Sequence, residues 1–135
     1  MLNNARKNVL LLEDEPVIGK VIRRTLSTDG YCVDIAENGQ IAKDKIASGN
    51  HYDILIFDIR TPVISGMQLY DYLDKEYPEM SKKVVFATGD YVNGVTRKFL
   101  EKVDRPFLAK PYTPVQIRSL VAQVLGAGLA AAGKK

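Results

Sequence analysis

The sequence has no tryptophan, and it has only one cysteine and one histidine among its 135 residues. Cys32 cannot form a disulfide within the chain, and no Cys-x-x-Cys motif surrounds it, so a redox thiol pair is excluded. His51 follows Gly49-Asn50, which predicts an exposed turn, and a single histidine excludes any site that needs two. A lone cysteine fits a reducing compartment, and we expect the protein in the cytoplasm.

Long apolar runs and blocks of like charge are also missing. The first apolar run, 9–12, stops at Glu13, which is too short for a signal peptide or a membrane span. Lysine and arginine number 19 against 16 acidic residues, a net charge of +3, and no run of five basic residues occurs. We therefore expect neither a membrane nor a nucleic acid as a direct partner.

The length and the composition, with 46% hydrophobic and 26% charged residues, are typical of one globular domain. Apolar runs that predict strands lie at 9–12, 31–36, 54–57, 84–87 and 107–109. Helical patterns lie between them, and a last helix with a Thr113–Gln116 capping box ends near residue 125. We expect a polar segment at 1–7, one domain at 8–125 and a flexible tail at 126–135.

Strand and helix patterns alternate five times, which predicts a parallel sheet with helices on both faces. Three of the runs are apolar at successive positions, as interior strands should be: 9–12, 54–57 and 84–87. Asp34 interrupts the second run and Pro106 begins the fifth, which suits two edges. The predicted fold is therefore α/β and doubly wound, a flavodoxin-like (βα)5 sheet in the order 2-1-3-4-5.

Polar residues end four of these strands, at the edge where such sheets bind ligands. They are Glu13 and Asp14, Asp58, Thr88 and Lys110. Three carboxylates and one ammonium leave a net charge of −2, which a hard cation such as Mg²⁺ would neutralise. A metal, a lysine and a nucleophilic carboxylate suit phosphoryl transfer, with Thr88 and backbone N–H groups near Gly89 as donors to the phosphoryl oxygens.

Each of these residues also has a purely structural interpretation when taken alone. Glu13 and Asp14 precede Pro16 and would favour the dipole of the helix that begins there. Asp58 would serve as a turn-forming aspartate, Thr88 as an ordinary strand end and Lys110 as a surface lysine. The functional interpretation rests on their conjunction, because four strand ends carry compatible chemistry.

In these stretches the sequence resembles the receiver domain of two-component response regulators, over roughly residues 8–125. The matching motifs are Glu13-Asp14-Glu15-Pro16, Asp58-Ile59-Arg60-Thr61-Pro62 with Gly66-Met67, Val85-Phe86-Ala87-Thr88-Gly89 and Phe107-Leu108-Ala109-Lys110-Pro111-Tyr112. The stretches 105–111 and 86–90 are similar to receivers attached to hybrid histidine kinases.

The resemblance implies that Asp58 accepts a phosphoryl group from a phosphohistidine of a histidine kinase or a histidine phosphotransfer domain. It implies that Glu13, Asp14, Asp58 and the backbone carbonyl of Arg60 hold Mg²⁺. Lys110 would pair with the phosphoryl group, and the Lys110-Pro111 bond would be cis.

The resemblance also assigns a switch and an output. Thr88 and Phe107 would change position with phosphorylation, although an aromatic residue in an edge strand is often only packing. Arg60 and Asp90 match positions that tune phosphoryl lifetime, and two solvated surface charges explain them equally well. The surface formed by helix 95–103, strand 107–109 and the last helix would contact a downstream partner or an adjoining domain, or a second copy if a homodimer forms.

Other functions would use the same fold. A pseudo-receiver binds proteins without phosphorylation, but Glu13, Asp14, Asp58, Thr88 and Lys110 are all intact. A phosphatase of related fold would need an acid two residues after its nucleophile, where this chain has Arg60. A flavin mononucleotide binder would need a phosphate-binding loop after the first strand, which is missing. The sequence therefore predicts a regulatory phosphoacceptor rather than an enzyme that turns over substrate.

Overall fold

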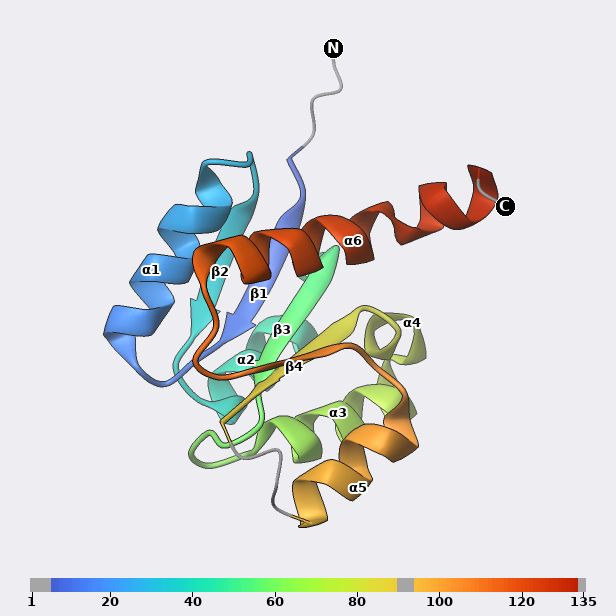
Figure 1. The fold of residues 1–135 in the computed structure, drawn as a ribbon. Coiled ribbons are helices and arrows are strands. Elements are labelled where there is room, and N and C mark those ends of the chain that lie inside the picture. The colour runs from blue at the N-terminus through green and yellow to red at the C-terminus, as the bar shows by residue number, and fades with distance from the viewer. Residues whose placement is uncertain (1–5, 90–93, 134–135) are drawn as a thin grey trace.

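The structure, a computed structural model, describes residues 6–89 and 94–133, the last seven of these as backbone only. Strands and helices alternate along the chain, except that two helices, α3 and α4, lie between β3 and β4 (Figure 1). They are β1 (Asn8–Leu12), α1 (Pro16–Ser27), β2 (Cys32–Ala36), α2 (Gly39–Ala47), β3 (Ile54–Asp58), α3 (Gly66–Glu76), α4 (Pro78–Ser81), β4 (Val84–Thr88), α5 (Gly94–Val103), β5 (Phe107–Ala109) and α6 (Pro114–Gly133). Among the described residues, no helix has the length and apolar character needed to cross a bilayer.

The sheet has five parallel strands in the order β2-β1-β3-β4-β5, which confirms the predicted order and fold class. Every residue of β3 and β4 is buried, whereas β2 and β5 have exposed positions, as expected for interior and edge strands. The register pairs Leu12 with Phe57 and Asp58 with Ala87. The carboxyl ends of β1, β3 and β4 therefore lie side by side.

Helices cover both faces of the sheet in separate layers. In Figure 1, α1 and α6 lie on one side of the sheet, and α2, α3 and α5 lie on the other. One buried cluster packs α1 and α6 onto the first face: Val9, Leu11, Ile22, Leu26, Val33, Ile54, Ile56, Val85, Ile117 and Val121. The opposite cluster, which includes Phe57, Leu69, Phe86 and Leu100, covers the second face. Burying these side chains is the main stabilising contribution to the fold.

Two helices differ from the sequence prediction. One helix was expected between β3 and β4, but Pro78 begins a second, short helix, α4, because proline is favoured at a first helical position. The last helix runs to Gly133 instead of ending near residue 125. The extension 126–133 contains four alanines, the strongest helix formers, which outweigh the three glycines among them. The flexibility of 126–135 and the proposed segment boundaries stay predictions.

Asp53, in the segment before β3, forms a hydrogen bond with the start of β1. This contact lies at the end of the sheet away from the carboxyl ends of the strands. Its Oδ2 accepts the Asn8 backbone N–H at 2.7 Å, and its Oδ1 lies 3.1 Å from Nε2 of the exposed His51. Burial alone would raise the pKa of Asp53, but the bonds from Asn8 and His51 outweigh it and hold the pKa below its usual value.

We expect Asp53→Asn to lower the free energy of unfolding by about 1 kcal/mol at pH 7, because a charge-assisted hydrogen bond is lost. A carboxyl group with a depressed pKa stabilises the fold above the unfolded-state pKa of about 4, and this stabilisation disappears as the pH falls through the folded-state pKa. Urea unfolding of both proteins from pH 7 down to pH 3 should show the difference shrinking. The exposed Asp71→Asn is the control, and an equal loss there would contradict the assignment.

Candidate functional site

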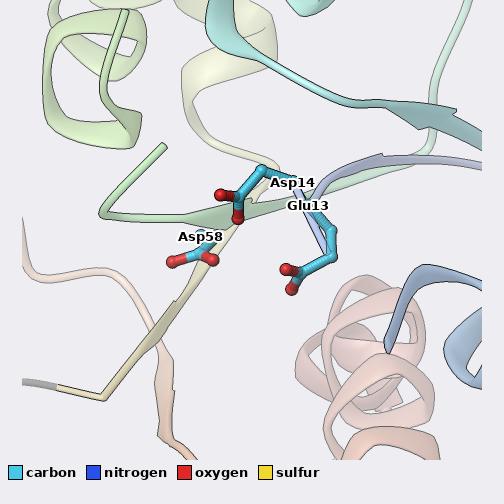
Figure 2. A group of neighbouring side chains, drawn as sticks. All are labelled: Glu13, Asp14 and Asp58. Carbon is cyan, nitrogen blue, oxygen red and sulfur yellow. The ribbon is translucent and has the colours of Figure 1, made fainter. Parts of the chain in front are cut away.

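Three carboxylates meet where β1 and β3 end (Figure 2). One oxygen from each of Glu13, Asp14 and Asp58 lies within 4.8 Å of the other two. Glu13 and Asp58 are buried, at 2% and 6% exposed, while Asp14 is exposed at the rim. The parallel register explains the meeting, because Leu12 and Phe57 are paired, the acids 13 and 14 follow Leu12, and Asp58 follows Phe57 as the last residue of β3. Such an oxygen-only donor set suits a hard divalent cation.

Lys110 reaches the buried pair of acids from the loop after β5. Its Nζ lies 2.8 Å from Asp58 Oδ2 and 3.1 Å from Glu13 Oε1. Burial alone would lower the pKa of Lys110, but the hydrogen bond to Asp58 and the charges of both acids outweigh it and raise the pKa above its usual value. The ammonium therefore stays charged beside Asp58 throughout the physiological range.

Glu13 is the most buried acid of the cluster. Burial raises the pKa of Glu13, the nearby Asp58 carboxylate adds to the increase, and the Glu15 backbone N–H and Lys110 oppose it. Glu13 Oε2 accepts that N–H at 3.1 Å, and Oε1 accepts from Lys110. Within the described part of the chain, each Glu13 oxygen thus has one donor, and Lys110 is shared with Asp58.

The loop after β3 is held tightly around Asp58. Asp58 Oδ1 accepts the Arg60 backbone N–H at 3.2 Å, and the Gly66 N–H donates to the Ile59 carbonyl at 3.0 Å. A Cβ at Gly66 would lie 2.5 Å from the Asp58 carbonyl oxygen, so the start of α3 packs directly on the backbone of Asp58. This close approach explains the glycine in the Gly66-Met67 motif.

A strained turn continues the same loop. The Ile64 N–H donates to the Pro62 carbonyl at 2.8 Å, and Val63 between them has a φ of 70°. This is a γ-turn with a positive central φ, an unfavourable conformation for a β-branched residue. Gly39 at the start of α2 packs against the turn, where its Cβ would lie 1.9 Å from the Ile64 carbonyl oxygen. The surrounding contacts therefore hold the loop in place against its own backbone preference.

The other predicted residues lie along the same edge of the sheet. Thr88 is fully buried at the end of β4, and its carbonyl accepts the Lys110 backbone N–H at 2.7 Å. Gly89 follows it, and a Cβ there would lie 3.8 Å from Lys110 Cβ. Phe107 is 36% exposed on the edge strand β5. Asp90, predicted with Arg60 to tune phosphoryl lifetime, lies outside the described residues.

The sequence prediction missed contributions that carry no local signal. Three such features depend on contacts between elements. They are the Glu15 backbone donor, the packing of Gly39 on the β3–α3 loop and the buried hydroxyl of Tyr112. Two predicted features are present: the Lys110-Pro111 bond is cis, and Thr113 and Gln116 form the capping box of α6. A hollow of about 490 Å³, lined in part by Asp14, Arg60 and Thr96, opens beside the acids.

The model of the response regulator receiver domain matches residues 9–122. The chain belongs to this family. The receiver domain is 30% identical over 121 residues to a probable transcriptional regulator, ycf29, of Porphyra purpurea, covering 87% of this chain and 56% of the relative. It is 39% identical over 105 residues to the response regulator ArlR of Staphylococcus haemolyticus, covering 74% and 46%. The chain thus spans about half the length of these two relatives.

A hybrid histidine kinase of Dictyostelium discoideum also matches, at 28% identity over 121 residues, which is 87% of this receiver domain and 5% of the kinase. Among solved structures, a CheY-like receiver domain of Methanospirillum hungatei has a TM-score of 0.83 at 23% identity, covering 94% and 99% of the two chains, and supports the fold. The receiver domain of the sensor histidine kinase PA1611 of Pseudomonas aeruginosa has a TM-score of 0.76 at 26% identity, covering 90% and 99%. Its structure contains a magnesium ion in the active-site cleft. The family is that of regulatory phosphoacceptor domains in two-component signalling, and the acidic pocket described above agrees with that role.

Proposed function

We propose that Asp58 is the phosphoacceptor of this receiver domain and stores a phosphoryl group as a signal. The observation that carries the proposal is the 2.8 Å contact between Lys110 Nζ and Asp58 Oδ2 inside a cluster of three acids. A fixed ammonium beside a nucleophilic carboxylate is ready to stabilise negative charge on an incoming phosphoryl group. Asp58 is the last residue of the buried strand β3, which is apolar up to Phe57 and fixes the position of the Asp58 backbone.

We propose that the same cluster binds Mg²⁺ through Glu13, Asp14, Asp58 and the backbone carbonyl of Arg60. The donor set fits this ion, because it has carboxylate oxygens and neither cysteine nor histidine among the clustered side chains. When bound, the ion supplies positive charge to the phosphoryl oxygens. Asp14, the exposed member of the cluster, is the ligand nearest to solvent.

The side chains of the domain supply the remaining chemistry. A carboxylate oxygen of Asp58 forms a bond to phosphorus while the bond from phosphorus to the imidazole nitrogen of a phosphohistidine breaks, which gives an acyl phosphate and a free histidine. Lys110 pairs with the phosphoryl oxygens, and the Thr88 hydroxyl and Gly89 N–H donate hydrogen bonds to them. Arg60 stands where a phosphatase would carry an acid, which favours storage over turnover and gives Arg60 and Asp90 a role in phosphoryl lifetime.

We propose that Thr88 and Phe107 transmit phosphorylation to the surface formed by α5, β5 and α6. Phe107 lies on the exposed edge strand, one element away from the site, so a small shift of the strand ends would reach it. A downstream partner, an adjoining domain or a second copy would contact this surface. The phosphoryl donor would be a histidine kinase or a histidine phosphotransfer domain in the cytoplasm.

Intact-mass spectrometry after incubation with acetyl phosphate tests the proposed function. With Mg²⁺ present, the wild-type domain should gain the mass of one phosphoryl group, and peptide mapping should locate the group on Asp58. Chelation of Mg²⁺ should suppress the gain. A domain that never gains this mass, even with a histidine phosphotransfer donor, would be a pseudo-receiver that binds proteins without phosphorylation.

A further inference from the structure

The first half of α1 carries apolar side chains on the surface of the domain. Val17 is 73% exposed and Val21 is 50% exposed, whereas Ile22 and Leu26 of the same helix are buried. Because Val17 and Val21 are four residues apart, they lie next to each other on one face of the helix and form an apolar stripe. Covering such a stripe with a second apolar surface is favourable, because it removes both side chains from water.

A groove of about 470 Å³ lies beside this stripe, between α1 and the start of α6, which cover the same face of the sheet (Figure 1). Both valines of the stripe line the groove, and Pro114 and Ile117 of α6 line it as well. One turn further along α6, Arg118 donates two hydrogen bonds to Asp29, just after α1, at 2.8 and 2.9 Å. These bonds fix the position of α6 against α1, so the groove is formed before any partner binds.

Charged side chains of opposite sign flank the two ends of the stripe. Glu15 is exposed just before the helix, and Arg24 is exposed one turn after Val21. Arg24 also lies seven residues after Val17, which places it on the same face of the helix as the valines. This face of α1 therefore has an acidic start, an apolar middle and a basic end. Two such helices attract each other when they are antiparallel, whereas a parallel pair would bring like charges together.

An antiparallel pairing of α1 with α1 of a second copy matches the apolar and the charged side chains at once. If the two-fold axis lies at the level of Gly19, Val17 of one copy faces Val21 of the other, because each valine lies two residues from that level. At a rise of ~1.5 Å per residue, Glu15 and Arg24 lie about 6 and about 7.5 Å from the same level, on opposite sides. Each glutamate therefore meets the arginine of the other copy, and the symmetry forms every contact twice.

We propose that α1 is a self-association surface, through which two copies of this chain pair antiparallel across Val17 and Val21. A second copy fits this face better than an unrelated protein, because the two-fold symmetry itself supplies the reversed order of charges. The contact involves neither α5 nor β5, so it differs from a dimer through the proposed output surface. It also needs no phosphoryl group, and the inference therefore goes beyond the proposed function.

Sedimentation equilibrium of the unphosphorylated chain tests the proposal. The wild type should change from the monomer mass to the dimer mass as its concentration rises. The double variant Val17→Ser/Val21→Ser should weaken the dimer at least about a hundredfold, since four valines per dimer no longer leave water. The matched control is Val95→Ser, which removes a 69% exposed valine from α5 and should dimerise like the wild type.

Charge reversal tests the antiparallel orientation. Glu15→Arg or Arg24→Glu alone should each weaken the dimer about tenfold, because both ion pairs of the dimer become repulsive. Glu15→Arg combined with Arg24→Glu should restore the wild-type dissociation constant to within about threefold, because the two changes compensate only if these residues meet. Circular dichroism should show the same helix content in all variants.

Three outcomes would contradict the inference. A wild type that stays monomeric at millimolar concentration would leave this face of α1 to a different protein. A dimer that is weakened by Val95→Ser but not by the two serines in α1 would place the contact at α5. Charge reversals that do not compensate each other would exclude the antiparallel pairing. Asp58→Asn should dimerise like the wild type, so a failure of the proposed function would leave this inference unaffected.

Discussion

Asp58→Asn is expected to abolish phosphorylation of the domain, with a loss of at least about a hundredfold in adduct formed. Asparagine keeps the shape of the side chain and one oxygen that Lys110 can contact, but the amide is a far poorer nucleophile than a carboxylate. The substitution also removes one of the three acids that would hold Mg²⁺, so metal affinity should fall as well. Intact-mass spectrometry after incubation with acetyl phosphate measures the first effect directly.

The Asp58→Asn protein should remain folded, so that its loss of phosphorylation is not explained by unfolding. Lys110 still has Glu13 as a partner at 3.1 Å, and the like charge that raises the pKa of Glu13 is gone. Its urea midpoint should therefore lie close to that of the wild type. An Asp58→Asn protein that gains the phosphoryl mass at the wild-type rate would place the phosphoacceptor elsewhere.

Gly39→Ala is expected to lower the free energy of unfolding by about 3 kcal/mol. The added Cβ would lie 1.9 Å from the carbonyl oxygen of Ile64 and 2.5 Å from its Cβ, so the backbone of the β3–α3 loop must move. Overpacking against backbone is costly because no flexible side-chain end can yield. This loop also carries Arg60, so the rate of phosphorylation should fall together with stability.

Gly94→Ala is the matched control, because Gly94 is likewise the first residue of a helix, but no atom of the described residues lies within 4 Å of its added Cβ. It should be neutral or slightly stabilising, since alanine restricts the unfolded chain. Urea unfolding of the three proteins gives the comparison. Equal stabilities for Gly39→Ala and Gly94→Ala would mean that the β3–α3 loop is free to move away from α2.

Much of the fold was predictable because its signals are local. Continuous apolar runs marked β1, β3 and β4 as interior strands, and Asp34 and Pro106 marked the edges. This assignment matched the doubly wound order that the sheet has. The helix α4 and the length of α6 were not predicted. A proline signals both the end of one helix and the start of the next, and an alanine-rich segment with glycines is balanced between helix and coil.

The chemical groups of the candidate site were predictable from the sequence, whereas the contacts between them were not. The sequence by itself determined which chemical groups end the strands, because Glu13, Asp14, Asp58, Thr88 and Lys110 each follow a recognisable apolar run. Only the tertiary structure decided how these groups are connected: that one lysine contacts two acids, and that Gly39 packs against the β3–α3 loop. The physical reason is that strand patterns report burial, whereas distances between side chains 50 or more residues apart depend on how the strands and helices pack.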